Sequence, residues 1–335
     1  YFITGGTGFI GTHLSSLLHE VHPETKIYNL DIVEPGTPLP TVKNYKPALR
    51  KGEEHAATFI YCDVRQPIEL EKVDITPDDV IFNFAAVHRT PGHPDPAYFE
   101  TNIRGAENVC AFAERHGIRK IVFTSSIAPY GAAEELKEET TLPMPNTPYG
   151  ISKLVAEKIH QTWQAGGEGR QLTIVRPGVV FGRGENGNFT RLYWGIRGHK
   201  FMYPGRKDTI KACIYVKELV RFMLYRLEHH DSGVELYNCC YEPAYTIEHI
   251  VESMKRVTNM KVKVPFMPGW LIMTAAGIAG ALGSPMGICP ARVRKLQIST
   301  NICGKKLSAS GYRFHYTFEE ALADWYKDNG NLYLQ

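Results

Sequence analysis

The chain has 335 residues, which is enough for one large domain or two smaller ones. Its apolar and charged fractions, 43% and 22%, are typical of a soluble globular protein, and a net charge of +3 without a basic block argues against a nucleic-acid partner. The seven cysteines are scattered and lack the spacing of metal ligands, so we expect reduced thiols in a cytoplasmic protein and no metal site.

Short apolar runs alternate with helical patterns through the first half of the chain. A loop rich in proline and glycine is expected at residues 34–51. Strands are expected at residues 1–4, 27–31, 59–62, 80–84, 121–123 and 172–175. One helix should follow the first strand, and two long helices are expected at residues 96–116 and 148–165. Near-continuous apolar strands that alternate with helices predict an α/β fold, with a parallel sheet covered on both faces.

The pattern is less regular after residue 178. Helices are expected at residues 189–197, 216–227, 246–257, 270–282 and 318–326. Short strands are expected at residues 212–215, 234–238 and 262–265. We therefore predict a first domain at residues 1–178 and a smaller, mixed α/β region at residues 179–335, with the chain free to cross between them more than once.

Residues 264–290 carry no charge, which raises the question of a membrane span. Four prolines interrupt the segment, and only residues 270–282 are continuously compatible with a helix. Such a helix is about 20 Å long and too short to cross a bilayer. A buried or interface helix is the prediction; contact with a membrane surface stays open as the alternative.

Three glycines follow the first expected strand, at Gly5, Gly8 and Gly11. Between a strand and a helix this spacing is the dinucleotide fingerprint, because glycines allow a tight turn and a close approach of the backbone to a pyrophosphate. Asp31 ends the second strand about 20 residues later, where a carboxylate accepts hydrogen bonds from ribose hydroxyls and repels a 2′-phosphate. The prediction is NAD bound to a Rossmann-type, doubly wound sheet, with Asp31 as a plain turn residue as the alternative.

Tyr149 and Lys153 are four residues apart, on one face of the helix expected to begin at Pro148. A phenol has a pKa of about 10, and an ammonium group beside it favours the phenolate. Lowering this pKa by about three units takes roughly 4 kcal/mol. The product is a base that removes the proton of an alcohol while hydride leaves its carbon.

Polar residues end other expected strands, at the edge where a parallel sheet binds ligands. The run Thr124-Ser125-Ser126 closes the fifth strand, so one of its hydroxyls is placed to bond the substrate oxygen beside Tyr149. Serines in this position also form turns. Asp63 follows the third strand, where it would receive the adenine amino group or cap a helix.

Together these residues resemble the extended short-chain dehydrogenase/reductase family, in its NAD-dependent nucleotide-sugar epimerase/dehydratase branch. The matches run from Gly5 to about Gly182, with weaker ones to the C-terminus. No single motif is specific, but the set in this order is. Its members are the glycine triplet, Asp31, Asp63-Val64, Phe84-Ala85-Ala86, Thr101-Asn102, Thr124-Ser125-Ser126, Tyr149 with Lys153, and Arg176-Pro177.

The resemblance implies roles for these residues. Ser126 would supply the catalytic hydroxyl, Tyr149 the base, and Lys153 a contact to the nicotinamide ribose. The residues implied for NAD binding are Gly5, Gly8, Phe9, Ile10, Gly11, Asp31, Asp63, Val64, Ala85, Ala86, Asn102, Thr124, Tyr149, Lys153 and Pro177. The helices near residues 96–116 and 148–165 correspond to those that pair across a homodimer in the family.

Departures from the family pattern reduce the number of reactions that the chain is expected to catalyse. Members that remove water carry an Asp-Glu pair just after the catalytic hydroxyl, and decarboxylating members carry a Glu there. This chain has Ile127-Ala128-Pro129 instead, so elimination lacks its proton donor and acceptor. Epimerases need neither group, because they take hydride from a carbinol carbon and return it to the other face.

The diphosphate site departs from the family as well. Val179 stands where many epimerases place an Asn that contacts a phosphate, and Lys217 lies in a strand that differs from the family's usual one. The cations available for a diphosphate, each equally well explained as a solvated surface charge, are Arg183, Arg206, Lys207, Lys211 and Arg292. His88 and Arg89 follow the fourth strand and are further substrate candidates, with a structural role as the alternative.

The leading hypothesis is an NAD-dependent epimerase of a nucleotide-diphosphate sugar, with a role in polysaccharide biosynthesis. A one-way dehydrogenase or reductase of a 3β-hydroxysteroid-like or flavonol-like alcohol is the first alternative, and the uncharged residues 264–290 would suit it. A non-catalytic dinucleotide-sensing protein is the second. Such proteins tend to lose the tyrosine or the lysine, and this chain keeps both Tyr149 and Lys153.

Overall fold

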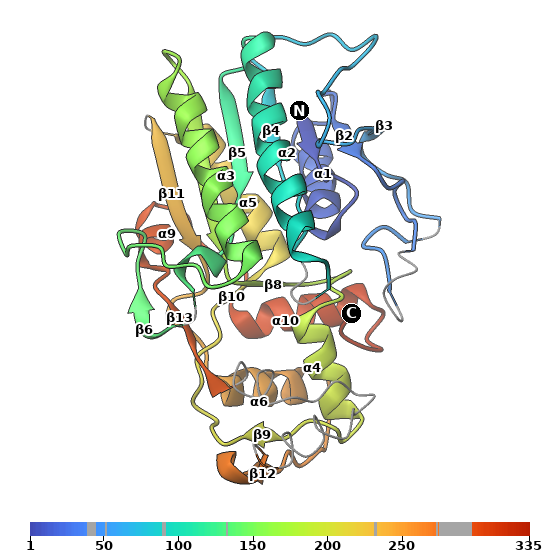
Figure 1. Cartoon of the computed structure of the whole chain (residues 1–335). Coiled ribbons are helices and arrows are strands. Elements are labelled where there is room, and N and C mark those ends of the chain that lie inside the picture. Colours follow the sequence, from blue (N-terminus) through green and yellow to red (C-terminus); the bar gives the residue numbers. More distant parts are fainter. Residues whose placement is uncertain are drawn as a thin grey trace.

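The structure is a computed structural model, which describes residues 1–38, 45–50, 52–88, 92–131, 133–230, 233–272, 274 and 297–335. Its centre is a parallel sheet of seven strands in the order β11-β7-β5-β4-β1-β2-β3 (Figure 1). The strands are β1 (Phe2–Thr4), β2 (Tyr28–Asp31), β3 (Thr58–Tyr61), β4 (Val80–Asn83), β5 (Lys120–Thr124), β7 (Gln171–Pro177) and β11 (Val234–Cys239). The predicted α/β class with a doubly wound parallel sheet is confirmed.

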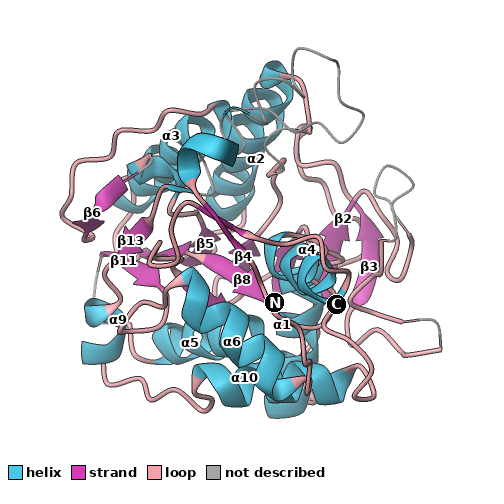
Figure 2. Ribbon diagram, turned by 90° about the horizontal axis from the view of Figure 1, so that it is seen from below, coloured by secondary structure: helices cyan, strands magenta, loops and turns pink. Residues whose placement is uncertain are grey.

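Helices cover both faces of this sheet (Figure 2). α2 (Asp95–Arg115) and α3 (Pro148–Ala165) pack side by side on one face, and α1 (Phe9–Val21) and α5 (Val216–Glu228) on the other. β11 and α5 both follow residue 178, so the central sheet and its cover draw on both halves of the sequence.

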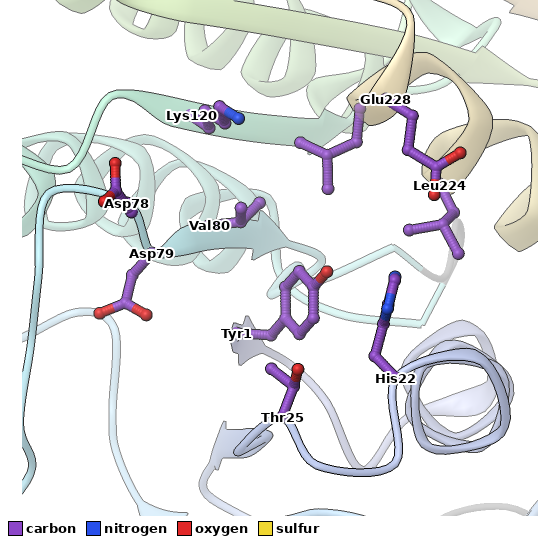
Figure 3. Close-up of a pocket in the computed structure, with 10 residues that line it drawn as sticks. Tyr1, His22, Thr25, Asp78, Asp79, Val80, Lys120, Leu224 and Glu228 are labelled. Carbon is purple, nitrogen blue, oxygen red and sulfur yellow. The ribbon is translucent and has the colours of Figure 1, made fainter.

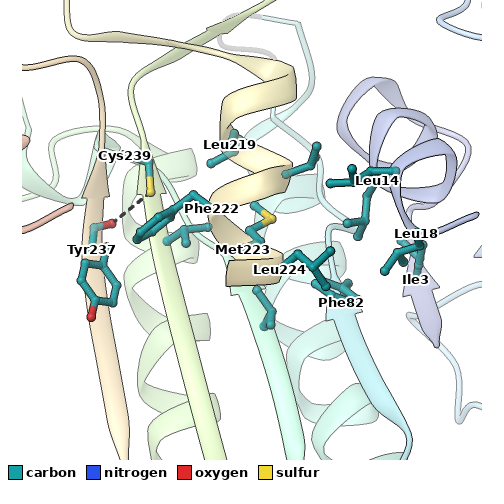
Figure 4. Close-up of a cluster of buried hydrophobic side chains, with 14 of the residues drawn as sticks. Ile3, Leu14, Leu18, Phe82, Leu219, Phe222, Met223, Leu224, Tyr237 and Cys239 are labelled. Atoms are coloured by element: carbon teal, nitrogen blue, oxygen red, sulfur yellow. Dashed lines mark hydrogen bonds between the residues drawn. The ribbon is translucent and has the colours of Figure 1, made fainter. Parts of the chain in front are cut away.

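Both faces of the sheet are covered by clusters of buried apolar side chains. Under α1 and α5 the buried cluster includes Leu14, Leu18, Phe82, Phe222 and Met223 (Figure 4). A second cluster under α2 and α3 is built on Phe2, Phe112, Phe123 and Trp163. Burying apolar surface on both faces is the arrangement that near-continuous apolar strands require.

The start of α3 is specified locally. Thr147 is the N-cap, and its side-chain oxygen accepts a hydrogen bond of 3.1 Å from the Gly150 amide. Pro148 occupies the first turn, where its fixed φ suits a helix and no amide hydrogen is needed. This start fixes the helical phase of the residues that follow, including Tyr149 and Lys153.

A smaller region lies beyond the carboxyl edge of the sheet (Figure 1). Its helices are α4 (Asn188–Arg197), α6 (Ile247–Val257) and α10 (Phe318–Asp328), while α9 (Lys305–Ala309) lies against β11. Its paired strands are β8 (Val179–Phe181) with β10 (Cys213–Tyr215), β9 (Tyr203–Pro204) with β12 (Phe266–Met267), and β6 (Ala133–Lys137) with β13 (Thr300–Ile302). A third buried cluster, which includes Phe181, Phe318 and Trp325, holds this region together.

One prediction in this region is wrong, and a second falls mostly outside the described residues. The strand expected at residues 262–265 is wrong, since pairing begins only at Phe266 and lasts two residues. Prolines at 265 and 268 supply no backbone donor, which limits the pairing to that short stretch. Of the helix expected at residues 270–282, the structure describes only residues 270–272 and 274. There Trp270 is 73% exposed and Leu271 42% exposed, so these positions are not buried.

Candidate active site

The predicted site residues gather at the carboxyl edge of the central sheet. The strand order reverses between β1 and β4, and ligands of doubly wound folds bind at that switch point. The glycine turn follows β1, Asp31 ends β2, Ala85 lies just past β4, and Thr124 ends β5. The predicted site residues therefore lie at one edge of the sheet, which is where the sequence placed them.

Each of the three positions in the turn favours glycine for a different physical reason. Gly5 has φ +68°, and a Cβ on it would lie 2.8 Å from the Ala85 amide nitrogen. A Cβ on Gly11 would lie 2.5 Å from the Gly6 carbonyl oxygen, so helix α1 packs directly on the turn. A Cβ on Gly8 meets only the Gly5 carbonyl oxygen, at 3.2 Å. Gly8 is thus the member whose missing side chain leaves space for something outside the protein.

Asp31 lies beside this turn. Its Oδ2 accepts hydrogen bonds from the Thr7 hydroxyl at 2.7 Å and from the Thr7 amide at 3.2 Å. Its Oδ1 accepts from the Val33 amide at 3.2 Å. The carboxylate is held next to the glycine turn, which is the position that recognition of a ribose requires.

The residues after β3 are already engaged. Arg65 donates to both carboxylate oxygens of Asp63, from Nε at 2.9 Å and from Nη2 at 2.6 Å, and holds the pKa of Asp63 below its usual value. Val64 is 5% exposed and packs under α2 against Gly105. An adenine contact from Asp63 would have to share this carboxylate with Arg65.

The side chain of Ser126 lies beside that of Tyr149, close enough for its hydroxyl to lower the pKa of the phenol. The Ser126 Oγ accepts from the Ala128 amide at 3.1 Å, which fixes the hydroxyl at the end of β5. Burial raises the pKa of Tyr149 to about 12, and the Ser126 hydroxyl partly offsets that rise. The protein alone therefore does not produce the lowered pKa expected from the sequence, because burial outweighs the polar contact.

Lys153 lies one helical turn after Tyr149 and is 2% exposed. Its Nζ sits 4.5 Å from the centre of the Phe123 ring. Burial lowers the pKa of Lys153 to about 7, and the Glu157 carboxylate one turn further along α3 opposes that shift. The charge of this lysine is therefore poised near neutral pH and depends on its neighbours.

Glu157 joins the three elements that carry the site, and the sequence analysis missed it. Its carboxylate accepts from the Ser125 hydroxyl on β5 and from Arg176 on β7, at 2.8 Å from Nε and 2.6 Å from Nη2. Glu157 is 1% exposed and Arg176 3% exposed. The signal was present, since Glu157 follows Lys153 by four residues and shares its helix face.

Asn102 ties α2 to the other side of the crevice. Its side-chain amide bonds the Val87 backbone in both directions, at 2.8 and 3.1 Å. Its Nδ2 also donates to the Ser152 hydroxyl at 2.8 Å, and that hydroxyl donates to the Tyr149 carbonyl at 2.9 Å. This chain of bonds fixes the loop after β4 against the start of α3.

Two further predicted positions lie at strand ends. The Thr124 hydroxyl is buried and has no hydrogen-bond partner within the part of the chain that the structure describes. Pro177 ends β7, and its carbonyl accepts from the Ile127 amide at 3.3 Å. An orphaned buried hydroxyl beside the crevice is a group that a ligand would satisfy.

The substrate candidates are not brought together in the same way. Arg183 forms a two-bond ion pair with Glu53, at 2.7 and 3.1 Å, and Arg206 binds Asp208 and Glu134. His88 is exposed after β4. Among the other cations, Lys207 pairs with Glu248 and Lys211 donates to the Ile298 carbonyl. Arg89 and Arg292 lie outside the described residues.

A separate cavity opens at the opposite edge of the sheet, where the strands begin (Figure 3). Tyr1, Val80 and Lys120 line it, together with His22 and Glu228. It lies away from the carboxyl edge and shares no residue with the predicted site.

The residues at the carboxyl edge fit a dinucleotide. A pyrophosphate suits the open space at Gly8 and the free amides expected in the first turn of α1. A ribose suits the carboxylate of Asp31, and a polar nicotinamide group suits the orphaned Thr124 hydroxyl. NAD is therefore the cofactor that this crevice is built to hold.

Curated 4-epimerases are similar to this chain over most of its length. It is 30% identical over 328 residues to the N-acetyl-alpha-D-glucosaminyl-diphospho-ditrans,octacis-undecaprenol 4-epimerase of Escherichia coli O157:H7, with 96% of this chain and 92% of that protein covered. It is 29% identical over 295 residues to the UDP-glucose 4-epimerase of Halalkalibacterium halodurans, with 79% and 82% covered.

Solved structures share the fold over nearly the full length. The UDP-N-acetylglucosamine 4-epimerase from Methanobrevibacter ruminantium, in complex with UDP-N-acetylmuramic acid, superposes with a TM-score of 0.72 at 21% identity, covering 97% of this chain and 96% of that one. The UDP-glucuronic acid 4-epimerase from Bacillus cereus, in complex with NAD, gives 0.71 at 19% identity and 98% coverage of both chains.

The family is settled by sequence rather than by shape alone. Residues 1–240 match the profile of the NAD dependent epimerase/dehydratase family, and this span includes the glycine turn, Asp31, Ser126, Tyr149 and Lys153. The chain therefore belongs to the NAD-dependent epimerase/dehydratase family.

Proposed function

We propose that this chain is an NAD-dependent 4-epimerase of a sugar carried on a diphosphate. The observation that carries the proposal is the placement of the Ser126 hydroxyl beside Tyr149, one helical turn from the buried Lys153. Bound NAD would accept hydride from a carbinol carbon and return it. Tyr149 takes the hydroxyl proton, Ser126 orients that hydroxyl, and Lys153 supplies positive charge beside the phenolate.

Elimination is disfavoured by the same geometry. The residues that follow Ser126 form a tight 3₁₀ turn over Ala128–Tyr130, with Pro129 and Tyr130 buried. This turn places no carboxylate after the catalytic hydroxyl, and dehydration would need a donor and an acceptor there. Epimerisation needs only one base and the hydride carrier.

The direct test is turnover without added cofactor. Purified protein is incubated with UDP-glucose, UDP-N-acetylglucosamine and the corresponding GDP- and TDP-sugars, and C4 epimers are followed by NMR. We expect one epimer pair to equilibrate with no net NADH. Stoichiometric NADH together with a keto product would identify a one-way dehydrogenase instead.

A polyprenyl diphosphate is the second candidate for the group that carries the sugar. The relative from Escherichia coli that covers nearly the whole chain is named for such a lipid-linked substrate. Comparing the turnover of UDP-N-acetylglucosamine with that of undecaprenyl-diphospho-N-acetylglucosamine separates the two substrates, since both test the same epimerisation.

We also propose a homodimer formed through α2 and α3, in a cytoplasmic protein. The two helices lie side by side on one face of the sheet, and Ile151 on α3 is 40% exposed (Figure 1). All six cysteines within the described ranges are free thiols, which suits a reducing compartment. Light scattering should give a dimer mass that Ile151→Arg shifts toward the monomer; a wild-type protein that is monomeric at micromolar concentration would contradict this assembly.

A further inference from the structure

An apolar segment is exposed at the end of the molecule remote from the central sheet. We define it as residues 265–272, which carry β12 and the start of the following helix. Within it Phe266 is 51% exposed, Trp270 73% and Leu271 42%. Figure 1 places β12 and its partner β9 at this remote end, below α6. Three large apolar side chains exposed so close together need a reason, because single exposed ones are ordinary but clusters are not.

The segment is held in place by the backbone. Phe266 pairs with Tyr203, and the amides of Tyr203 and Gly205 donate to the carbonyls of Pro265 and Met267, both at 2.9 Å. A Cβ on Gly205 would lie 2.9 Å from the Gly269 Cα, so the two backbones touch there. Phe266 therefore projects from a paired strand, and Trp270 and Leu271 lie on the helical residues directly after it.

Positive charge flanks the apolar segment. Residues 257–272 contain no acidic residue, whereas Lys261 and Lys263 precede the segment and Lys200 precedes β9. All three lysines are exposed, and none forms an ion pair with another described residue. The surface thus combines aromatic side chains with unneutralised ammonium groups.

We propose that residues 265–272, with Lys200, Lys261 and Lys263, dock this protein on an anionic lipid bilayer. Tryptophan and phenylalanine lie at the level of the lipid headgroups, and lysines beside them attract anionic lipid. A protein partner fits the same surface less well, because lysine is depleted from protein interfaces. Among the helices of the described residues, none combines the length and the apolar character that a membrane span requires. The proposal does not depend on which diphosphate carries the sugar.

The test uses the full chain with two kinds of vesicle, one of phosphatidylglycerol with phosphatidylethanolamine and one of phosphatidylcholine. We expect the protein to float with the anionic vesicles, to be released by high salt, and to show a blue shift of tryptophan fluorescence. Trp270→Asp, Phe266→Ser and the pair Lys261→Glu with Lys263→Glu should each lower the bound fraction about tenfold or more. Leu332→Asp is the matched control, since Leu332 is 64% exposed elsewhere on the surface.

Several results would overturn the proposal. The first is a wild-type protein that does not float with anionic vesicles. The second is a Trp270→Asp variant that floats as well as the wild type, and the third is a Leu332→Asp control that loses as much of the bound fraction as the test variants. A concentration-dependent dimer in lipid-free solution that Trp270→Asp abolishes would instead make this face a contact between copies. Equal unfolding temperatures of the variants establish that folding is intact. Turnover of a soluble sugar diphosphate without vesicles should be unchanged, which keeps this test separate from that of the proposed function.

Discussion

At the scale of single residues, the charge of Lys153 depends on the groups that surround it. Burial lowers its pKa to about 7, and the Glu157 carboxylate acts in the opposite direction. The groups around the lysine are Tyr149, Glu157 and His160 on α3, with Phe123 on β5. Of these only Glu157 carries a negative charge, so we expect it to keep the lysine an ammonium ion during the reaction.

The variant Glu157→Gln tests that role. Removing the carboxylate lowers the Lys153 pKa further, so the alkaline limb of the kcat profile should move to lower pH and kcat should fall by about 10-fold or more. Arg176 would also be left buried without its partner, at a cost to folding of about 3 kcal/mol or more. Steady-state kinetics across pH and urea unfolding measure the two effects.

The control is the second buried pair of this kind, Arg226 with Glu235, where Nε donates at 3.0 Å and Nη2 at 2.6 Å. Glu235→Gln should lose comparable stability while its pH profile stays unchanged. If Glu157→Gln and Glu235→Gln behave alike in both measurements, Glu157 serves folding only.

His160 predicts how stability responds to acid. The ring is fully buried, its Nδ1 donates to the Ala156 carbonyl at 2.7 Å, and Asn83 donates to its Nε2 at 3.1 Å. Burial lowers its pKa from 6.5 to about 4, so the folded state binds fewer protons than the unfolded one below pH 6.5. Stability should therefore fall as the pH drops, with His160 contributing a loss of about 2 kcal/mol between pH 7.5 and pH 5.

The comparison is with His160→Gln, which cannot titrate. Its free energy of unfolding should decline less over the same pH range than that of the wild-type protein. An identical decline in the two proteins would place the acid sensitivity elsewhere.

The sequence predicts single residues well where a motif names them. Gly5, Asp31, Ser126, Tyr149 and Lys153 all lie at the predicted edge. Glu157 and the pairing of Arg183 with Glu53 were not foreseen, because both depend on which elements the fold brings together. Glu53 and Arg183 are 130 positions apart, and no local pattern connects them.

At the scale of elements, the turn between β1 and α1 separates cofactor binding from folding. Gly8→Ala should cost less stability than Gly11→Ala, because its Cβ meets only the Gly5 carbonyl oxygen, at 3.2 Å. The same methyl would occupy the space expected for the pyrophosphate, so NAD affinity should drop about tenfold or more. Titration calorimetry and thermal unfolding without cofactor measure the two quantities.

Gly11→Ala is the matched variant in the same turn. Its Cβ would lie 2.5 Å from the Gly6 carbonyl oxygen, so we expect about 1–3 kcal/mol of destabilisation from overpacking. A Gly8→Ala protein that binds NAD with unchanged affinity would contradict the assignment of this turn to the cofactor.

Strong periodicity predicted the elements of the central sheet and the long helices, since each strand is an apolar run between turn signals. The strand at residues 212–215 was predicted and is β10, but its partner β8 and the strand β9 were missed, and β12 was displaced. Each strand in these pairs has two or three residues, and such lengths are set by tertiary contact rather than by local preference.

At the scale of the whole molecule, the fold brings the parts of the chain before and after residue 178 together at the carboxyl edge of the sheet. The cofactor turn, Ser126 and the Tyr149–Lys153 helix belong to the sheet, while the smaller region covers the same edge. With NAD bound at this edge, one hydride would leave the sugar carbon and return to it without being lost to solvent or to product.

The most direct test of that claim uses a sugar diphosphate labelled with deuterium at C4. We predict that the wild-type protein interconverts the C4 epimers with the label retained, that no net NADH forms, and that Tyr149→Phe still binds NAD but turns over at least about 100-fold more slowly. Loss of the label to water, net formation of NADH, or a Tyr149→Phe variant with an unchanged rate would contradict the account.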